Sequence, residues 1–154
     1  MEDSMDEIIA NIIRREGGYV VDQGGPTKYG ITIPKYAEYL GKKTTQVSAA
    51  DIQALTEAVA YKVYVWIFKK WKIDKIELPA LLDLLFDCMV NSGEKTAIQW
   101  LQNLAGVVVD GDFGPKTTAA VNKQSKKLYY ALLAYRLRFW SNLAKQNKHK
   151  ESLR

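Results

Sequence analysis

The sequence predicts a mainly α-helical single domain with a small β-hairpin excursion after its first helix. Apolar residues recur at helical spacing along most of the 154-residue chain, which is long enough to bury its own core. Five glycines and two prolines interrupt this pattern over residues 17–34. Neither an internal repeat nor a linker rich in glycine, proline or serine divides the chain, so we expect residues 1–154 to form one domain.

A first helix is expected over residues 4–16, where four isoleucines recur at helical spacing. They are Ile8, Ile9, Ile12 and Ile13. The segment after this helix contains two short β-branched pieces, residues 19–21 and 31–33, on either side of a turn-rich stretch. Short pieces of this kind joined by turn residues are typical of a hairpin.

Prolines and a capping pattern mark the starts of the later helices. Pro34 and Pro115 suit the first turn of a helix, and Ser48 with Asp51 forms an N-terminal capping pattern. Residues 81–90 are apolar nearly all round, which is typical of a buried central helix. The expected helices span residues 34–40, 48–71, 81–90, 94–104, 115 onward and 125–146.

The residue inventory excludes several kinds of chemistry. Cys88 is the only cysteine, so neither an intramolecular disulfide nor a cysteine metal site is expected. His149 is the only histidine and lies in a polar stretch, so a zinc site or a histidine-based triad is not expected either. The loop over residues 110–112 lacks the later acidic ligand of a calcium loop. We therefore expect no metal and no cofactor, and a chemistry of carboxylates, hydroxyls and amides.

A net charge of +5 is concentrated towards the C-terminus. Basic surface favours anionic polymers such as nucleic acid, anionic membranes and bacterial cell walls, although runs of charge are also ordinary solvated faces. The acidic N-terminus does not read as a conventional signal peptide, and no apolar run is long enough to predict a transmembrane segment. The basic residues are Lys123, Lys126, Lys127, Arg136, Arg138, Lys145, Lys148, Lys150 and Arg154.

Glu16 ends the first helix and is the candidate general acid. Its spacing places it on the apolar stripe of the isoleucines, where a carboxylate is not expected, and two glycines follow it. Partial burial and the negative end of the helix dipole both disfavour an ionised carboxylate. A glycosidase needs a protonated carboxylic acid to protonate the leaving oxygen. The alternative is a solvated Glu16 paired with one of three cations, Arg14, Arg15 or Lys28.

Three blocks of sequence, taken together, resemble one known family. The first is Glu-Gly-Gly-Tyr at residues 16–19 followed by Gly-Gly-Pro-Thr-Lys-Tyr-Gly-Ile at 24–31. The second is Phe-Asp-Cys-Met-Val-Asn-Ser-Gly at 86–93 with the Ala-Ile-Gln-Trp-Leu-Gln that follows at 97–102, and the third is Val-Asp-Gly-Asp-Phe-Gly-Pro-Lys-Thr at 109–117. The set resembles the glycoside hydrolase family 108 muramidases, which are lysozyme-like enzymes found as phage endolysins and as secretion-activator-type lysozymes.

The resemblance implies a lysozyme-like fold and cleavage of the β-1,4 bond between N-acetylmuramic acid and N-acetylglucosamine in peptidoglycan. It implies a catalytic portion over residues 1–93, a helical peptidoglycan-binding portion over 94–146 packed on it, and a polar tail over 147–154. We expect a monomer whose partner is the glycan strand rather than nucleic acid. Without a signal peptide, the protein would be made in the cytoplasm and reach the wall through a holin-like pore or a dedicated export route.

The resemblance also implies roles for individual residues. Phage-type lysozymes use a Glu, an Asp and a Thr; by analogy Glu16 would protonate the glycosidic oxygen, while Asp22 and Thr27 hold the attacking water and give inversion. The loop is shorter than is usual in the family and leaves Asp22 as the only carboxylate between Glu16 and Thr27. The alternatives are a turn-forming Asp22 and a Thr27 hydroxyl bonded to backbone. The expected substrate contacts are Tyr19, Tyr29, Gly30, Asp87 and Asn91.

Several aromatic residues and Asp87 each have two possible roles. Tyr64, Trp66 and Trp71 are candidates for stacking on sugar rings, or else fill the core, whereas Trp100 is expected in the core. Asp87 lies on a strongly apolar helix, where a carboxylate must be paired or functional, and bonding to the backbone amides of the glycine-rich excursion is its alternative role.

Two alternatives to an enzyme remain open from the sequence. One is a non-catalytic peptidoglycan-binding or assembly module, suggested by the shortened excursion. The other is a helical nucleic-acid binder, suggested by the basic C-terminal helix.

Overall fold

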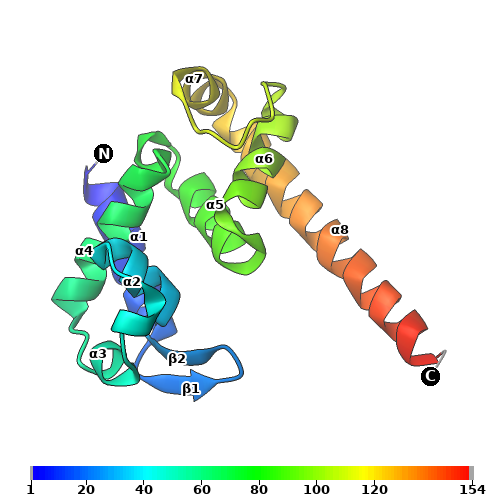
Figure 1. The fold of residues 1–154 in the computed structure, drawn as a ribbon. Helices are drawn as coiled ribbons and strands as arrows, with labels where there is room; N and C mark the ends of the chain where they lie inside the picture. The colour runs from blue at the N-terminus through cyan, green and yellow to red at the C-terminus, as the bar shows by residue number, and fades with distance from the viewer. Residues whose placement is uncertain (1, 153–154) are drawn as a thin grey trace. The chain divides into compact units, whose positions relative to one another are not determined.

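The structure of the protein, a computed structural model, describes the backbone of residues 2–152 and the side chains of residues 5–148. Contacts within the chain divide it into two compact units, residues 1–70 and residues 71–154. The first unit contains α1 (Glu2–Glu16), β1 (Val20–Asp22), β2 (Gly25–Lys28), β3 (Ile31–Thr32), α2 (Ile33–Leu40), η1 (Thr44–Gln46), α3 (Ala49–Gln53) and α4 (Glu57–Lys70) (Figure 1). The second contains η2 (Ile73–Lys75), α5 (Pro79–Ser92), α6 (Glu94–Ala105), α7 (Pro115–Lys123) and α8 (Ser125–Ser152).

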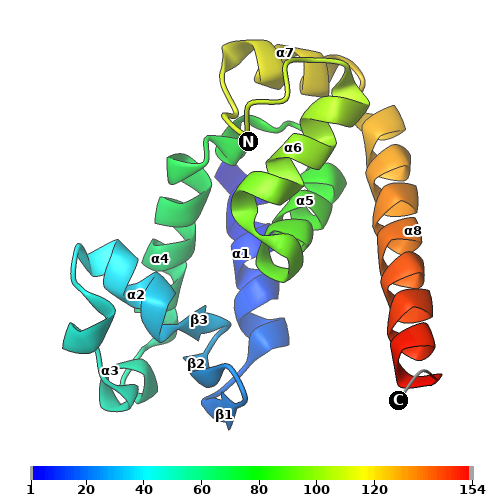
Figure 2. The same ribbon diagram turned by 45° about the vertical axis from the view of Figure 1, so that its right-hand side comes forward.

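The first unit is built on α1 and α4, which lie side by side in Figures 1 and 2. The four isoleucines of α1 are all buried, which confirms the predicted apolar stripe. From α4, Ala60, Val63, Ile67 and Phe68 are buried as well. Burying one such large apolar side chain contributes about 1.5–3 kcal/mol, so this packing fixes where the C-terminal end of α1 lies.

A three-stranded antiparallel sheet in the order β1-β2-β3 follows α1. The sequence predicted the first and third strands but placed a turn where β2 lies, because that strand begins Gly-Pro. Pro26 pairs with Val21 of β1, whereas β3 reaches only Thr27 and Lys28. The missing N–H of Pro26 therefore faces no neighbour on the β3 side, which explains why a proline is tolerated in the middle strand.

The predicted helix over residues 48–71 is interrupted, and α3 and α4 replace it. Ser48 caps α3 as predicted, with its hydroxyl accepting the N–H of Asp51. The hydroxyl of Thr56 then accepts the N–H of Val59 at 3.3 Å, which caps the start of α4. No glycine or proline lies between the two helices to mark the break.

In the second unit, α5 packs against α6 and α8. The predicted central helix is confirmed as α5, on which Leu81, Leu85 and Phe86 are buried. Helix α8 has 28 residues and continues to Ser152, so the tail expected over 147–154 is helical up to that residue. Its C-terminal half extends beyond the ends of α5 and α6 in both views. None of the helices in the described part of the chain is both long and apolar enough to span a membrane.

Candidate active site

Glu16 is the last residue of α1, and its position is set by a defined helix end. Gly17 adopts a left-handed conformation (φ 66°), and its N–H bonds to the carbonyl of Ile13 at 3.1 Å, which terminates the helix. The Glu16 side chain is 41% exposed, and its Oε1 lies 3.8 Å from Nε of Arg15. The predicted burial of this carboxylate on the apolar stripe is therefore wrong. Pairing with Arg15, one of the sequence alternatives, is present as an exposed contact, and exposed pairs contribute little to stability.

The turn between β2 and β3 lies directly beside Glu16. Its two residues, Tyr29 (φ 54°) and Gly30 (φ 76°), are both left-handed, as in the tight turns that join antiparallel strands. A Cβ on Gly30 would lie 3.0 Å from Cγ of Glu16 and 2.7 Å from Oη of Tyr64. The turn is also tied to the end of α1, because the N–H of Tyr29 bonds to the carbonyl of Gly17 at 2.8 Å. The aliphatic part of Glu16 therefore packs on this turn.

Tyr64 reaches the same turn from α4. Its side chain is buried, and its Oη donates a hydrogen bond to the carbonyl of Tyr29 at 2.6 Å. Burial, and then the negative charge of Glu16, raise the pKa of the Tyr64 phenol, so the hydroxyl remains a donor at physiological pH. Because the ring is buried, stacking of Tyr64 on a sugar is excluded. The core position that the sequence left as the alternative for Tyr64 is observed, but its contact with the turn was missed, because no local pattern signals a contact between residues 35 positions apart.

Asp22 and Thr27 project on the same face of the sheet. Thr27 pairs with Val20, two residues before Asp22, and paired residues share a face of an antiparallel sheet. Oδ1 of Asp22 accepts the N–H of Gly24 at 2.7 Å, which is the turn-forming role that the sequence left open. The Thr27 hydroxyl makes no hydrogen bond to any residue that the structure describes, so the alternative of a backbone-bonded hydroxyl is not observed.

The backbone between Glu16 and β1 is open. A Cβ on Gly17 or on Gly18 would meet no atom within 4 Å, so an extended chain has room to approach the backbone there. Tyr19 follows these glycines and is half-buried. The ring of Tyr29 is also half-buried and lies 5.4 Å from Nζ of Lys28. Glu16, Tyr19, Tyr29 and Gly30 are thus gathered at one end of α1. Among the described residues, no three Asp, Glu, His or Cys side chains gather closely enough to hold a metal ion.

Comparison with known proteins identifies the family. Residues 9–93, more than half of the chain, match the family described as Glycosyl hydrolase 108, and residues 96–154 match one described as Predicted Peptidoglycan domain. The chain belongs to glycosyl hydrolase family 108. It is also similar to a solved structure titled "Structure of Brucella abortus SagA", with 30% identity, a TM-score of 0.78, and coverage of 92% of this chain and 82% of that chain. No curated protein matches the sequence.

These similarities confirm the lysozyme-like, mainly α-helical fold and the family expected from the sequence. The chain is a glycosyl hydrolase 108 protein of the lysozyme type that acts on peptidoglycan. The match to this family ends at Gly93, close to the expected boundary between the two portions, whereas the compact units divide before Trp71. The difference arises because α5 belongs to the family match but packs on α6 and α8.

Asp87 and Asn91 lie on α5, in the second compact unit. Oδ2 of Asp87 lies 2.5 Å from Nη1 of Arg136 on α8, and both side chains are partly buried. Nδ2 of Asn91 donates to the carbonyl of Asp87 at 2.8 Å and lies 3.4 Å from its Oδ1. Within the second unit, the Asp87 carboxylate is therefore paired with Arg136. Contact of either residue with substrate stays a prediction.

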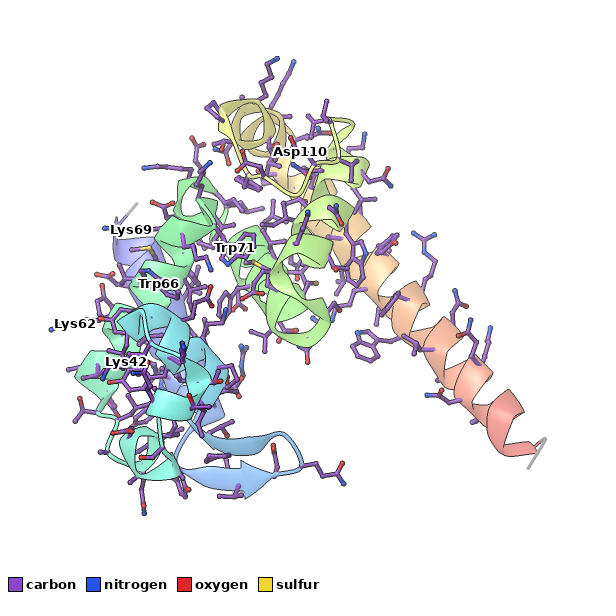
Figure 3. The ribbon with its side chains drawn as sticks, viewed as in Figure 1. Lys42, Lys62, Trp66, Lys69, Trp71 and Asp110 are labelled. Carbon is purple, nitrogen blue, oxygen red and sulfur yellow. The ribbon has the colours of Figure 1, made fainter. Side chains whose placement is uncertain are left out.

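The loop that matches the peptidoglycan domain is organised by Gln102, which is fully buried. Nε2 of Gln102 donates to Oδ1 of Asp110 at 2.8 Å, to the carbonyl of Asp112 at 2.9 Å and to Oγ1 of Thr117 at 3.2 Å. Its Oε1 accepts the N–H of Gly111 at 2.9 Å. Asp110 (labelled in Figure 3) therefore has a structural role in holding the loop.

Two of the tryptophans have partners that the sequence did not predict in detail. Trp66 of α4 (Figure 3) meets the edge of Tyr39 at 5.6 Å, and Nζ of Lys70 lies 5.2 Å from its ring centre. Trp100 of α6 packs on two aromatic rings of α8, Tyr135 and Phe139, with centroid distances of 5.1 and 4.9 Å. Trp100 is only half-buried, so the core position expected for it is not observed, although its ring packs within the second unit. The sugar-stacking role considered for Trp66 and Trp71 stays a prediction.

Proposed function

We propose that this protein cleaves the β-1,4 bond between N-acetylmuramic acid and N-acetylglucosamine, with Glu16 as the general acid. The supporting observation is the position of Glu16, which is fixed by the end of α1 and by the β2–β3 turn while its carboxylate reaches solvent. Open backbone at Gly17 and Gly18 leaves room for the glycan beside it. Hydrolysis requires a proton on the leaving oxygen, and a carboxylic acid in this position would supply it.

The second half of the reaction is assigned to the sheet face that carries Asp22 and Thr27. The hydroxyl of Thr27 would orient a water molecule, and the carboxylate oxygen of Asp22 that is not bonded to Gly24 would accept its proton. Water then attacks the anomeric carbon as the bond to the leaving oxygen breaks, and the proton of Glu16 passes to that oxygen. Attack from the face opposite the leaving group gives inversion at the anomeric carbon.

The region over residues 94–146 would hold the enzyme on the wall. Its match to a peptidoglycan domain supports this role, and so does the basic surface of α8. Peptidoglycan carries many carboxylates, which attract such a surface. We further propose that the protein acts as a monomer and reaches the wall through a membrane pore or a dedicated export route, as an endolysin or a secretion-activator-type lysozyme would.

The deciding experiment compares Glu16→Gln with Glu7→Gln, an exposed glutamate on the same helix. Release of reducing ends from purified peptidoglycan should disappear in Glu16→Gln and persist in Glu7→Gln, because only the first variant removes the proton donor. Mass spectrometry of the products should show N-acetylmuramic acid at the new reducing ends. Both variants should sediment with peptidoglycan as the wild type does.

The same assay tests the alternative of a non-catalytic wall-binding module. Equal and negligible release of reducing ends by the wild type and by Glu16→Gln, with sedimentation intact, would establish that alternative and refute the enzymatic proposal.

A further inference from the structure

We propose that Tyr64 is a positioning residue for the reaction, acting through the β2–β3 turn on the side chain of Glu16. The inference rests on the proposed role of Glu16 as the general acid. Tyr64 and Glu16 flank Gly30: the position of its absent Cβ lies 2.7 Å from Oη of Tyr64 and 3.0 Å from Cγ of Glu16. The turn therefore lies so close to both side chains that it has no room for a Cβ at position 30, and movement of the turn would change the surface beside Glu16.

The turn needs an external support, because Tyr29 is left-handed (φ 54°) although it carries a bulky side chain. Two hydrogen bonds hold its backbone. Its N–H bonds to the carbonyl of Gly17 on one side, and its carbonyl accepts the hydroxyl of Tyr64 on the other. The first tie comes from the residue next to Glu16 and the second from α4. The Tyr64 hydroxyl therefore connects the buried core of the unit to the backbone that adjoins the acid.

The chemistry explains why such a support matters. A general acid transfers its proton only within hydrogen-bond distance of the leaving oxygen, and a small displacement reduces the rate steeply. The Glu16 side chain is 41% exposed, so protein packing covers it only in part. The contact with Gly30 restrains its aliphatic part. Tyr64 acts on this contact from the interior, away from the substrate.

Tyr61 provides a matched control on the same helix. Its hydroxyl also bonds from α4 to α1, but its partner is Oδ1 of Asp6, near the opposite end of α1 from Glu16. Tyr61→Phe therefore removes a hydroxyl that bonds α4 to α1, and Tyr64→Phe removes a hydroxyl that bonds α4 to the β2–β3 turn. Only the second removal affects the backbone beside the acid.

The experiment measures kcat and KM on soluble peptidoglycan fragments for the wild type, Tyr64→Phe and Tyr61→Phe, with thermal unfolding of each. Tyr64→Phe should lower kcat about ten- to a hundredfold, while its KM stays within about a factor of two of the wild-type value. Tyr61→Phe should leave both constants within about a factor of two of the wild-type values.

A second variant tests the route through the turn. A glycine at position 29 adopts a positive φ without support from Tyr64. Tyr64→Phe should therefore reduce kcat less in a Tyr29→Gly background than in the wild type. Unchanged kcat in Tyr64→Phe would overturn the inference, as would equal losses in Tyr61→Phe or a loss confined to KM. If Glu16→Gln retains wild-type activity, the proposed function itself fails, which separates that outcome from a failure of the role of Tyr64.

Discussion

The carboxylate of Asp87 on α5 forms an ion pair with the guanidinium of Arg136 on α8, with 2.5 Å between Oδ2 and Nη1. The sequence predicted that a carboxylate on this apolar helix would be either paired or functional. The pair joins α5 to α8, which pack against each other. Leu84 and Cys88, close to Asp87 on α5, are buried. Removing either partner is expected to destabilise the second unit, because the remaining charge would be left unpaired in a partly buried position.

Removing the cation tests this role. Arg136→Leu should lower the free energy of unfolding by about 1–3 kcal/mol, because the Asp87 carboxylate loses its partner. Arg138→Leu, which removes an exposed arginine two residues further along α8, should change stability by less than about 0.5 kcal/mol. Urea unfolding at neutral pH measures both. Full stability in Arg136→Leu combined with lost activity would instead favour a substrate-binding role for the pair.

Cys88 should make stability fall at alkaline pH. Burial raises the pKa of its thiol from 9.0 to about 11, with Arg136 opposing the effect. Since the folded-state pKa is the higher one, this contribution is complete below pH 9 and is lost as the pH rises from 9 towards 11. The free energy of unfolding should therefore fall more steeply from about pH 8.5 to 10.5 in the wild type than in Cys88→Ala. Parallel curves in urea unfolding would contradict this expectation.

Gly30→Ala should damage both stability and catalysis. The added methyl group would lie 2.7 Å from Oη of Tyr64 and 3.0 Å from Cγ of Glu16, at a positive φ. We expect a loss of about 1–3 kcal/mol in unfolding free energy and a fall in kcat, because the turn must shift. Gly18→Ala is the control, since its methyl group meets no atom within 4 Å. Equal stability of the two variants in thermal unfolding would count against the packing described for Gly30.

Asp22→Asn separates the two roles of Asp22. Asparagine keeps an oxygen that accepts the N–H of Gly24 but cannot take a proton from water. If Asp22 is the base, Asp22→Asn should reduce kcat at least about a hundredfold while stability stays within about 0.5 kcal/mol of the wild type. Asp22→Ala should reduce both activity and stability. Retained activity in Asp22→Asn would show that Asp22 is not the base and acts only in the turn, through its hydrogen bond to Gly24.

Gln102→Leu should unfold the loop that matches the peptidoglycan domain. The change removes all four hydrogen bonds of the Gln102 amide and leaves the N–H of Gly111 buried without its acceptor. We expect a loss of about 2–4 kcal/mol in unfolding free energy and weaker sedimentation with peptidoglycan. Asn103→Leu, at the next and exposed position, should leave both unchanged. Normal sedimentation of Gln102→Leu would place wall binding elsewhere.

Much of the helical architecture could be predicted because local chemistry marks it. The isoleucine stripe of α1, Pro115 and the Ser48 cap each act within a few residues, and the structure confirms the buried stripe and the two helix starts that they predict. The break before α4 was missed because no glycine or proline marks it, and the Thr56 cap that begins α4 is the only local signal. The middle strand was missed because Pro26 is a poor strand residue and is tolerated only where β3 leaves its edge unpaired.

The sequence identified the main residue of the candidate site, but not the contacts that surround it. The Glu-Gly-Gly-Tyr segment identified Glu16, and its helix-end position is confirmed. Its exposure could not be predicted, because helical spacing does not show where the covering elements end. The contact of Tyr64 with the Tyr29 carbonyl depends on how α4 packs against α1, and sequence periodicity contains no information about that distance.

The bond between Tyr64 and Tyr29 also sets the order in which the site can form. The two residues are 35 positions apart, and the donor comes from α4, the last helix of the first unit. During synthesis the backbone beside Glu16 therefore lacks its support until residue 64 has left the ribosome and α4 has docked on α1. A chain that ends before residue 64 would therefore contain Glu16 beside a turn that lacks this hydrogen bond, so the site depends on completion of the whole first unit.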